Sequence, residues 1–257
     1  EGALFKDESD ASDHWHLYRT GFRMDYRPSQ ENNVTVHGNI YQGEAGQTAQ
    51  VTNENNELVF PSNHVARLNG AYFLANWRHV FSECSEYKLN CYWDFQSRDD
   101  PVLFNGYFHQ FDLDFQHAVR FLRNHQFIYG FGYHGQFTKS NDAFYIKFDP
   151  VSRYDNIYSA FFQDEISFLN DDFRVLAGSK FEYNEFTEFE IQPSLRLIYK
   201  PGRNTAFWAA QSRAVRTPAR VEQDMFVENV LLSSFDNPLT QGLLFQYQQH
   251  GDRNMRS

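Results

Sequence analysis

Hydrophobic and polar residues alternate one by one along most of this chain. In the segment 86–97, Tyr87, Leu89, Trp93 and Phe95 lie at alternate positions, and polar residues fill most of the others. Because successive side chains of a β-strand point to opposite faces of a sheet, a period of two predicts strands with one apolar and one polar face. Ten such strands are predicted, at about 13–26, 32–43, 64–79, 86–97, 107–119, 126–137, 157–168, 173–184, 189–199 and 204–214.

These predicted strands are long, at about 11–15 residues each. Strands of globular proteins cluster at ~5–6 residues, whereas a tilted strand that crosses a bilayer needs ~9–11. The polar positions include charges such as Asp112 and Lys180, and the apolar positions are rich in aromatic rings. The pattern therefore predicts an all-β fold, an antiparallel transmembrane β-barrel segment of about ten strands. A soluble β-sandwich is the alternative, but its strands would be shorter.

Short and long connections alternate between the predicted strands. The short ones are turns rich in Pro, Gly, Asn, Asp and Ser, at 27–31, 81–85, 120–124, 169–171 and 201–204. The long, polar ones lie at 44–63, 98–105 and 138–156, and a longer segment follows Ala214. Only the connection 185–188 departs from this order. Short turns at one rim and long loops at the other predict periplasmic turns and extracellular loops.

The composition narrows the class of protein further. The 257 residues include 27 Phe, 15 Tyr and 4 Trp, which excludes a disordered chain. The formal charge of -10 argues against a nucleic-acid partner, because nucleic acid calls for a basic surface. Cys84 and Cys91 form no metal or redox motif, and no nucleophile, base and acid converge on one face. We therefore expect no enzyme, no metal site and no cofactor.

Four segments carry a resemblance to a known family. They are YSAFFQDEI at 158–166, GSKFEYN at 178–184, EIQPSLRL at 190–197 and WAAQSRAVRTP at 208–218. Each resembles a barrel strand of the TonB-dependent outer-membrane receptors, and the resemblance extends over roughly residues 13–226. In that family a plug domain with a TonB-contacting box precedes a barrel of about 22 strands.

The resemblance implies a function and a set of partners. It implies a receptor in the outer membrane of a Gram-negative bacterium, surrounded by outer-membrane lipid. Such a receptor imports a scarce solute, such as a ferric siderophore, haem or corrinoid, and the TonB–ExbB–ExbD complex supplies energy through the plug. No plug or TonB box is visible, and residues 254–257 are not an aromatic-terminated closing strand. We therefore expect residues 1–257 to be one partial β-barrel domain; a complete barrel of about ten strands is the alternative.

Candidate functional residues fall into two groups. The charged face of the strands would line the lumen of the barrel, where wall residues contact the plug or water. Its members are Arg23, Asp25, Asn39, Lys88, Asp94, Asp112, Asp114, Lys180, Glu182, Glu190, Arg196 and Arg213. The long loops would contact a small, anionic, ring-containing metal chelate, because binding residues concentrate on loops held by a rigid scaffold. The loop candidates are Phe144, Tyr145, Arg153, Tyr154, Arg216 and Arg220.

Two other functions stay open at this point. A passive pore or adhesin-like barrel would have the same strands. A barrel-embedded hydrolase is a third hypothesis, weakened because no nucleophile, base and acid converge on one face.

Pro193 lies inside a predicted strand, where it removes a backbone donor, so we expect a bulge or irregularity there.

Overall fold

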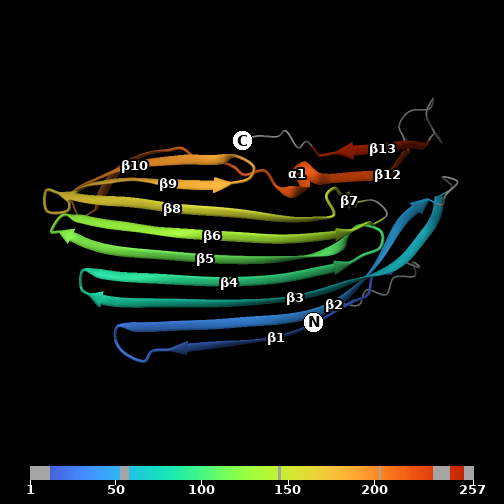
Figure 1. Cartoon of the computed structure of the whole chain (residues 1–257), viewed down its shortest axis with the longest axis horizontal. Coiled ribbons are helices and arrows are strands. Elements are labelled where there is room, and N and C mark those ends of the chain that lie inside the picture. Colours follow the sequence, from blue (N-terminus) through green and yellow to red (C-terminus); the bar gives the residue numbers. More distant parts are fainter. Residues whose placement is uncertain (1–11, 53–57, 144–145, 203, 234–243, 252–257) are drawn as a thin grey trace.

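Ten antiparallel strands form one curved sheet in the computed structural model (Figure 1). The structure describes residues 12–52, 58–143, 146–202, 204–233 and 244–251. The strands follow one another across the sheet in chain order, except that β7 is not part of it. They are β1 (Trp15–Tyr26), β2 (Asn32–Thr52), β3 (Leu58–Ser82), β4 (Ser85–Asp99), β5 (Asn105–Leu122), β6 (His125–Asn141), β8 (Ser152–Phe168), β9 (Phe173–Asn184), β10 (Glu188–Gly202) and β11 (Thr205–Ser212).

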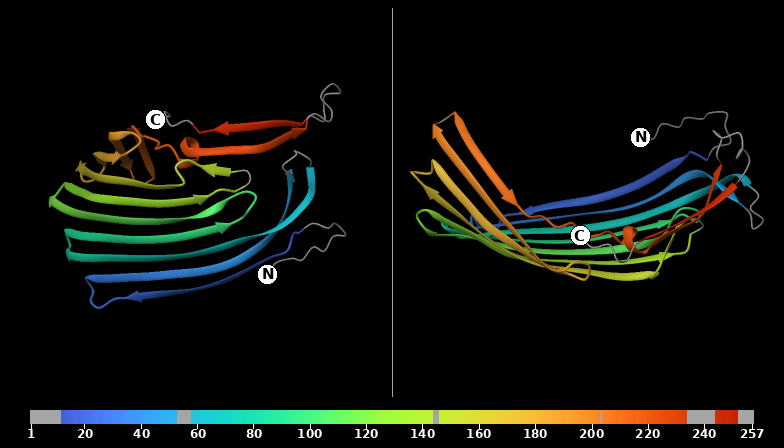
Figure 2. Two further views of the ribbon diagram at one scale, coloured as in Figure 1. Left: turned by 45° about the vertical axis from the view of Figure 1, so that its right-hand side comes forward. Right: turned by 90° about the horizontal axis from the view of Figure 1, so that it is seen from above.

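The segment after β11 folds back over this sheet. It contains the short helix α1 (Arg220–Asp224), followed by β12 (Met225–Ser233) and β13 (Leu244–His250). With β7 (Ile146–Phe148), the last two strands form a second sheet in the order β13-β12-β7. Viewed from above, the large sheet is a trough, and α1 with the start of β12 lies on its concave side (Figure 2).

All ten predicted strands are present, and the all-β antiparallel prediction is confirmed. The predicted lengths of two long loops are wrong. Most of 44–63 is strand, because β2 continues to Thr52 and its pairing with β3 runs to Thr52 opposite Leu58. The segment 138–156 likewise contains the end of β6, all of β7 and the start of β8. In both places the apolar alternation fades where the ladder of backbone hydrogen bonds continues, so the hydrophobic pattern alone ends the strands too early.

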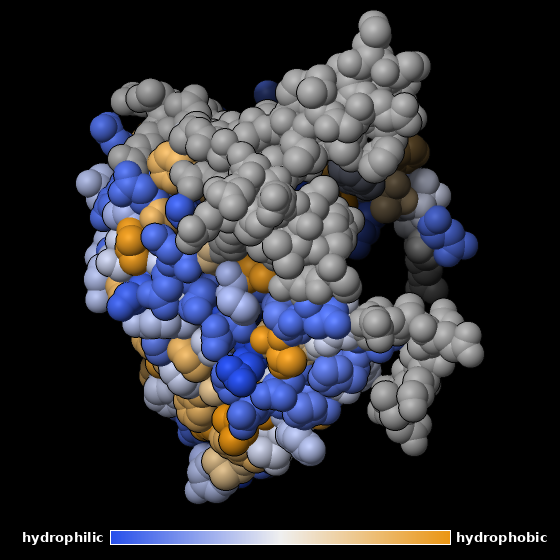
Figure 3. Space-filling model, turned by 90° about the vertical axis from the view of Figure 1, so that its right-hand side faces the viewer, coloured by the Kyte–Doolittle hydropathy of each residue, from blue (hydrophilic) through white to orange (hydrophobic). Residues whose placement is uncertain are grey.

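Short turns and long connections lie at opposite ends of the sheet (Figure 1). At the short-turn end, Leu169, Asn170 and Asp171 all have positive φ, at 53°, 55° and 72°, and reverse the chain between β8 and β9. At the long-connection end, the fully buried Asp100 accepts the backbone N–H groups of Val102 and Leu103 and fixes the β4–β5 connection. The described surface of this end is largely hydrophilic (Figure 3).

Few side chains of the described residues are buried. The buried apolar ones are Ala66, Val102, Ala143 and Phe148, while large rings along the strands stay exposed. A soluble domain would gather these rings into a core, because burial of apolar surface is the main favourable term in folding in water. The described strands are instead joined by hydrogen-bond ladders and show apolar side chains on an open face.

The apolar face has the height of a membrane band on β9 and β10. Tyr183 and Phe173, at the two ends of this face on β9, are ten positions apart and pair with Phe189 and Tyr199 on β10. Ten residues span about 33 Å along a strand at ~3.3 Å per residue. At a tilt of about 40° this distance covers about 25 Å, which is the height of the apolar band of outer-membrane barrels.

The expected irregularity at Pro193 is absent, so that prediction is wrong. The β9–β10 ladder runs without a register shift through Pro193 opposite Ser179. The carbonyl of Pro193 accepts the backbone N–H of Arg213 at 3.0 Å, so this residue turns its backbone groups toward the β11 side. Since β11 ends at Ser212, the missing donor of Pro193 costs no bond within the β10–β11 ladder.

Candidate functional site

The charged side chains of the strands share one face of the large sheet. Starting from Asp25 on β1, the pairing of successive strands gives one continuous row across nine strands. Its members are Asp25, Thr35, Asn76, Asn90, Asp114, Gly132, Ser159, Glu182 and Glu190. The same registers place Arg23, Asn39, Lys88, Asp94, Asp112, Lys180 and Arg196 on this face. Residues of α1 contact this face, which identifies it as the concave one.

The opposite, convex face carries most of the rings. Phe111 lies next to Asp112 in β5, and its partners Trp93 and Gly135 belong to the other face. Charged and aromatic side chains are not completely separated, because each face carries an exception. Phe161 lies on the concave face above Gly130, where an added Cβ would come within 2.8 Å of its ring. The ion pair of His125 with Asp164 lies on the convex face near the short turns.

Several charges on the concave face neutralise one another in local pairs. Lys180 donates to Glu182 at 2.7 Å, and Arg23 donates to Asp25 at 2.8 Å on the first strand. His134 Nδ1 lies 2.6 Å from Asp112 Oδ1 across the β5–β6 pair. The wall is therefore a hydrophilic surface on which several charges are paired, suited to contact with water or with a polar protein surface.

Arg213 lies just after the end of β11 and still reaches this wall. Its guanidinium donates to the Glu190 carboxylate at 2.7 Å, and also contacts the carbonyl of Ile191. The contact holds the start of the segment 213–225 against β10. We call this segment the strap, because it crosses the concave face between β11 and β12.

Within the strap, helix α1 begins directly after Ala219. The Glu222 carboxylate accepts the backbone N–H of Ala219 at 2.9 Å and also contacts the guanidinium of Arg216. The backbone hydrogen bond, helped by Arg216, lowers the pKa of Glu222 below its usual value. A negative charge here also stabilises the start of α1, where the free backbone N–H groups lie.

A cluster of four charges joins the strap to the concave wall near the long-connection end of the sheet. Asp224 of α1 is 1% exposed and accepts Arg153 Nη1 of β8 at 2.7 Å. Arg153 Nε lies 2.7 Å from Asp155, and Arg220 Nε lies 3.6 Å from Asp224. Two arginines and two aspartates leave the cluster neutral, which is how charges are tolerated away from water.

Burial and pairing shift the pKa values of Asp155, Arg153 and Arg220 in this cluster, which lies on the loop side of Tyr158. Burial raises the pKa of Asp155, although the charge of Arg153 opposes the shift. Burial would lower the pKa of Arg153, but the hydrogen bond to Asp224 and the charge of Asp155 raise it overall. Burial lowers the pKa of Arg220, with the two aspartates opposing. Each carboxylate of the cluster lies next to a guanidinium, and removal of that guanidinium would leave a buried charge unpaired, which is destabilising.

A cavity of about 540 Å³ lies between the strap and the wall. Its lining mixes aromatic residues, namely Phe104, Tyr107, Phe108, Phe148 and Phe186, with polar ones, and Arg220 belongs to its cover. The guanidinium of Arg220 lies 4.8 Å from the ring centre of Phe148, and that of Arg153 lies 4.4 Å from the ring centre of Phe186. Rings next to cations suit a flat, anionic or aromatic group.

The structure brings together only some of the predicted loop residues. Arg153 and Arg220 meet at Asp224, and Arg216 contacts Glu222 within the strap. Tyr154 is 68% exposed on the convex face, where its ring packs on Phe137 at 4.4 Å. Because neighbours in a strand point to opposite faces, Arg153 and Tyr154 cannot share one site.

Two predicted residues, Phe144 and Tyr145, lie outside the described residues. Four residues of the site were not predicted, namely Asp155, Asp224, Phe148 and Phe186. Asp155 follows the alternation of Arg153 and was within reach of the sequence pattern. Asp224 comes from a helix about 70 residues further along the chain, and no local pattern indicates that contact.

The described residues show no helix long and apolar enough to cross a bilayer. Within the same ranges, no group of three or more His, Cys, Asp or Glu side chains is arranged to hold a metal ion. Cys84 and Cys91 are both free thiols.

Comparison with known proteins decides the family. No curated protein matches the sequence. The profile of the family described as TonB dependent receptor-like, beta-barrel matches residues 4–248. The chain belongs to this family. Members of the family are β-barrel proteins of Gram-negative outer membranes, which agrees with the alternation and with the height of the apolar face.

Solved structures of TonB-dependent receptors share the fold of this chain. The siderophore receptor PirA of Pseudomonas aeruginosa superposes with a TM-score of 0.67 at 11% identity, over 94% of this chain and 41% of its own. PirA of Acinetobacter baumannii gives 0.65 at 12% identity, over 97% and 40%. A ferric enterobactin receptor variant of Pseudomonas aeruginosa, solved with enterobactin, gives 0.63 at 11%, over 94% and 39%. The chain thus spans about two fifths of these receptors.

Proposed function

We propose that this chain is part of a receptor that imports a scarce metal chelate across the outer membrane, driven by TonB. The observation that carries the proposal is the concave wall, a mostly polar and charged row of side chains across nine strands in a member of the TonB-dependent receptor family. An import receptor needs such a hydrophilic interior surface. The structural neighbours named as siderophore receptors favour a ferric siderophore over haem or corrinoid.

The remaining parts of the receptor belong to the same proposal. In the described sheet, β1 and β11 each pair with one neighbour, so their outer edges have free backbone groups. Such groups need partner strands in a membrane. We place the further barrel strands and a plug domain outside this chain. The plug would contact the concave wall at the residues predicted to face the lumen, and TonB–ExbB–ExbD would act on the plug.

The strap and its cavity are the proposed region of substrate contact. Arg216 has a side chain that is 74% exposed, so it can meet an anionic solute without first being uncovered. Arg153 and Arg220 are largely buried, so we give them the role of holding the aromatic cavity in shape. The function proposed here is binding and transport, without a catalytic step.

Uptake by living cells tests the proposal. A strain that lacks the full-length gene is complemented with it and given radiolabelled iron as catecholate, hydroxamate and haem chelates, or radiolabelled cobalt as a corrinoid. We expect uptake of one class, lost when TonB is deleted or a protonophore is added. Uptake that is independent of TonB, with channel conductance of the purified protein, would establish a passive pore instead. Arg216→Ala should weaken binding of that chelate, and Arg27→Ala, at the short-turn end, is the matched control.

A further inference from the structure

Two tyrosines stand next to one carboxylate on the concave face of β3 and β4, and a third comes from β2. Tyr72 of β3 pairs directly with Asp94 of β4, and Tyr92 precedes Asp94 by two positions on the same face. The ring centres of Tyr72 and Tyr92 are 6.3 Å apart. Tyr41 lies on β2, two strand spacings from Asp94, which is about 10 Å. Its phenol can reach the carboxylate only by crossing β3.

Gly70 allows the ring of Tyr41 to cross β3. This glycine pairs with Tyr41 on one side and with Gln96 on the other. A Cβ at Gly70 would collide with the ring and the hydroxyl of Tyr41, so the phenol lies over the backbone of β3. The negative charge of Asp94 is close enough to act on the hydroxyls of both Tyr41 and Tyr92. The three phenols and the carboxylate therefore share one patch of the concave face.

Two side chains of this patch lack the partner that a buried polar group normally has. Asp94 is 8% exposed and accepts the side-chain amide of Gln96 at 3.0 Å. It takes part in none of the ion pairs found in the described part of the chain. Asn39, which pairs with Tyr72, has a buried Oδ1 that accepts no hydrogen bond from any described residue. Buried charges are normally paired or bind a metal ion, so the patch is an all-oxygen set without its cation.

We propose that Tyr41, Tyr72, Tyr92 and Asp94 bind one bare ferric ion on the concave face. Oxygen ligands suit a hard cation, and Asp94 with two deprotonated phenols carries three negative charges, which balance those of Fe³⁺. The ordinary pKa of tyrosine is about 10, so at neutral pH only a strongly polarising ion displaces the phenol proton, which passes to water. This requirement selects Fe³⁺ over Mg²⁺ and Ca²⁺.

The ferric site is separate from the strap. Asp94 belongs to the same row as Asp155 of the charge cluster, three strand spacings away, which is about 14 Å. The inference therefore goes beyond the proposed binding of a chelate at the strap. It requires only that the concave face is wet.

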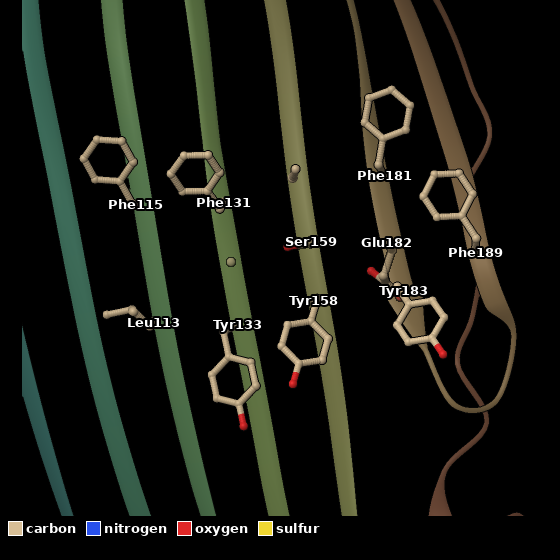
Figure 4. A pocket seen from close by; sticks show the side chains of 12 residues that line it. Leu113, Phe115, Phe131, Tyr133, Tyr158, Ser159, Phe181, Glu182, Tyr183 and Phe189 are labelled. Atoms are coloured by element: carbon tan, nitrogen blue, oxygen red, sulfur yellow. The ribbon is translucent and has the colours of Figure 1, made fainter.

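The convex face provides a matched control. Tyr133, Tyr158 and Tyr183 pair with one another in a row across the strands, and their hydroxyls point the same way (Figure 4). The row continues to Leu113 on one side and to Phe189 on the other, so these pairing partners include no carboxylate. Phenols without a neighbouring negative charge are not expected to hold a ferric ion. Tyr158→Phe thus removes the same atom as a change at the ferric site and leaves that site intact.

Absorption spectroscopy tests the site. The purified full-length receptor is given ferric citrate at neutral pH in detergent, and the visible band of phenolate-to-iron charge transfer is recorded. We expect a band that saturates at one ion per receptor and is lost in Tyr72→Phe/Tyr92→Phe. Asp94→Asn keeps the phenols, and we expect the affinity for iron to fall about a hundredfold. Tyr158→Phe should leave both the band and the affinity unchanged.

The outcomes separate the ferric site from the transport function. The absence of a band, or a band weakened equally by Tyr92→Phe and Tyr158→Phe, would overturn the inference. If the double variant does not reach the membrane, Tyr92→Phe alone decides, with a weaker resonance Raman signal of iron-bound phenolate expected. Uptake of the chelate is measured on the same variants. Normal TonB-dependent uptake without the band contradicts only the ferric site, and the band without such uptake would refute only the transport proposal.

Discussion

The attachment of the strap to the wall depends on Asp224, and its removal is the sharpest test of the site. In Asp224→Ala, Arg153 loses the carboxylate that lies 2.7 Å from its Nη1, and Arg220 loses its neighbour at 3.6 Å. Removing one partner of a buried ion pair costs about 3–5 kcal/mol. Arg153 keeps Asp155, so we take the lower value, about 3 kcal/mol.

This free energy sets the fraction of time that the strap is detached. A loss of about 3 kcal/mol raises the population of the detached state about a hundredfold. The bond after Arg220 lies inside α1 and is protected while the strap is attached. When opening is fast compared with cleavage, proteolysis follows the open population. Trypsin added to receptor in outer-membrane vesicles should therefore cut after Arg220 about a hundred times faster in Asp224→Ala.

An exposed ion pair at the same end of the sheet provides the control. Asp99 lies 3.7 Å from Arg67, with side chains 54% and 62% exposed, and such surface pairs contribute little. Asp99→Ala should leave cleavage of the strap unchanged. A double variant Arg153→Ala/Asp224→Ala should cost less than the sum of the two single changes, because neither charge is left alone. If Asp224→Ala is cut no faster than Asp99→Ala, the cluster does not hold the strap.

Two further predictions concern the faces of the sheet and the start of α1. In a background without native cysteines, Asp112→Cys should react with a water-soluble maleimide in the intact bilayer and Phe111→Cys should be shielded; equal reaction would contradict a two-sided wall. The Ala219 N–H and Arg216 lower the pKa of Glu222. The ionised Glu222 carboxylate therefore stabilises the start of α1 fully at a pH above the ordinary pKa of Glu, about 4.3. This stabilisation is lost as the pH falls through the pKa of Glu222 in the folded state. Hydrogen exchange at Ala219, corrected for intrinsic rates, should be faster in Glu222→Gln at neutral pH, and should accelerate in the unaltered protein only in acid.

The two faces of the sheet could be predicted from the sequence because they depend only on odd and even positions. A strand that alternates places Asp112 and Phe111 on opposite faces wherever its ends fall. The strand ends were less predictable, as the extension of β2 to Thr52 shows, because hydrogen-bond ladders continue where the hydrophobic alternation fades.

The residues that pair across neighbouring strands could not be predicted from the sequence, for a different reason. The two-residue turn between β5 and β6 pairs Leu122 with His125, and an uninterrupted ladder would then pair Asp112 with Gly135. A register shift between Arg120 and Leu122 moves the pairing by one residue, so Asp112 faces His134. A bulge of this kind adds one residue without a sequence signature of its own. The alternation still demands it, because only the shifted register keeps rings opposite rings.

Within the described residues, the sheet and the strap are held by different forces, and this difference bears on function. Backbone ladders join the strands, and a ladder tolerates most side-chain changes as long as the alternation is kept. The strap meets the wall through a few specific side chains, above all Asp224 and Arg153, so a small change in local charge or contact can shift it. A ligand moves an equilibrium only by its difference in affinity for the two states. In the proposed function, a solute that enters the cavity or pairs with the exposed Arg216 would act directly on the strap, whereas one bound to the middle of the wall would meet only the ladder. If the chain belongs to an import receptor as proposed, the strap is therefore the part where we expect binding to be converted most readily into movement.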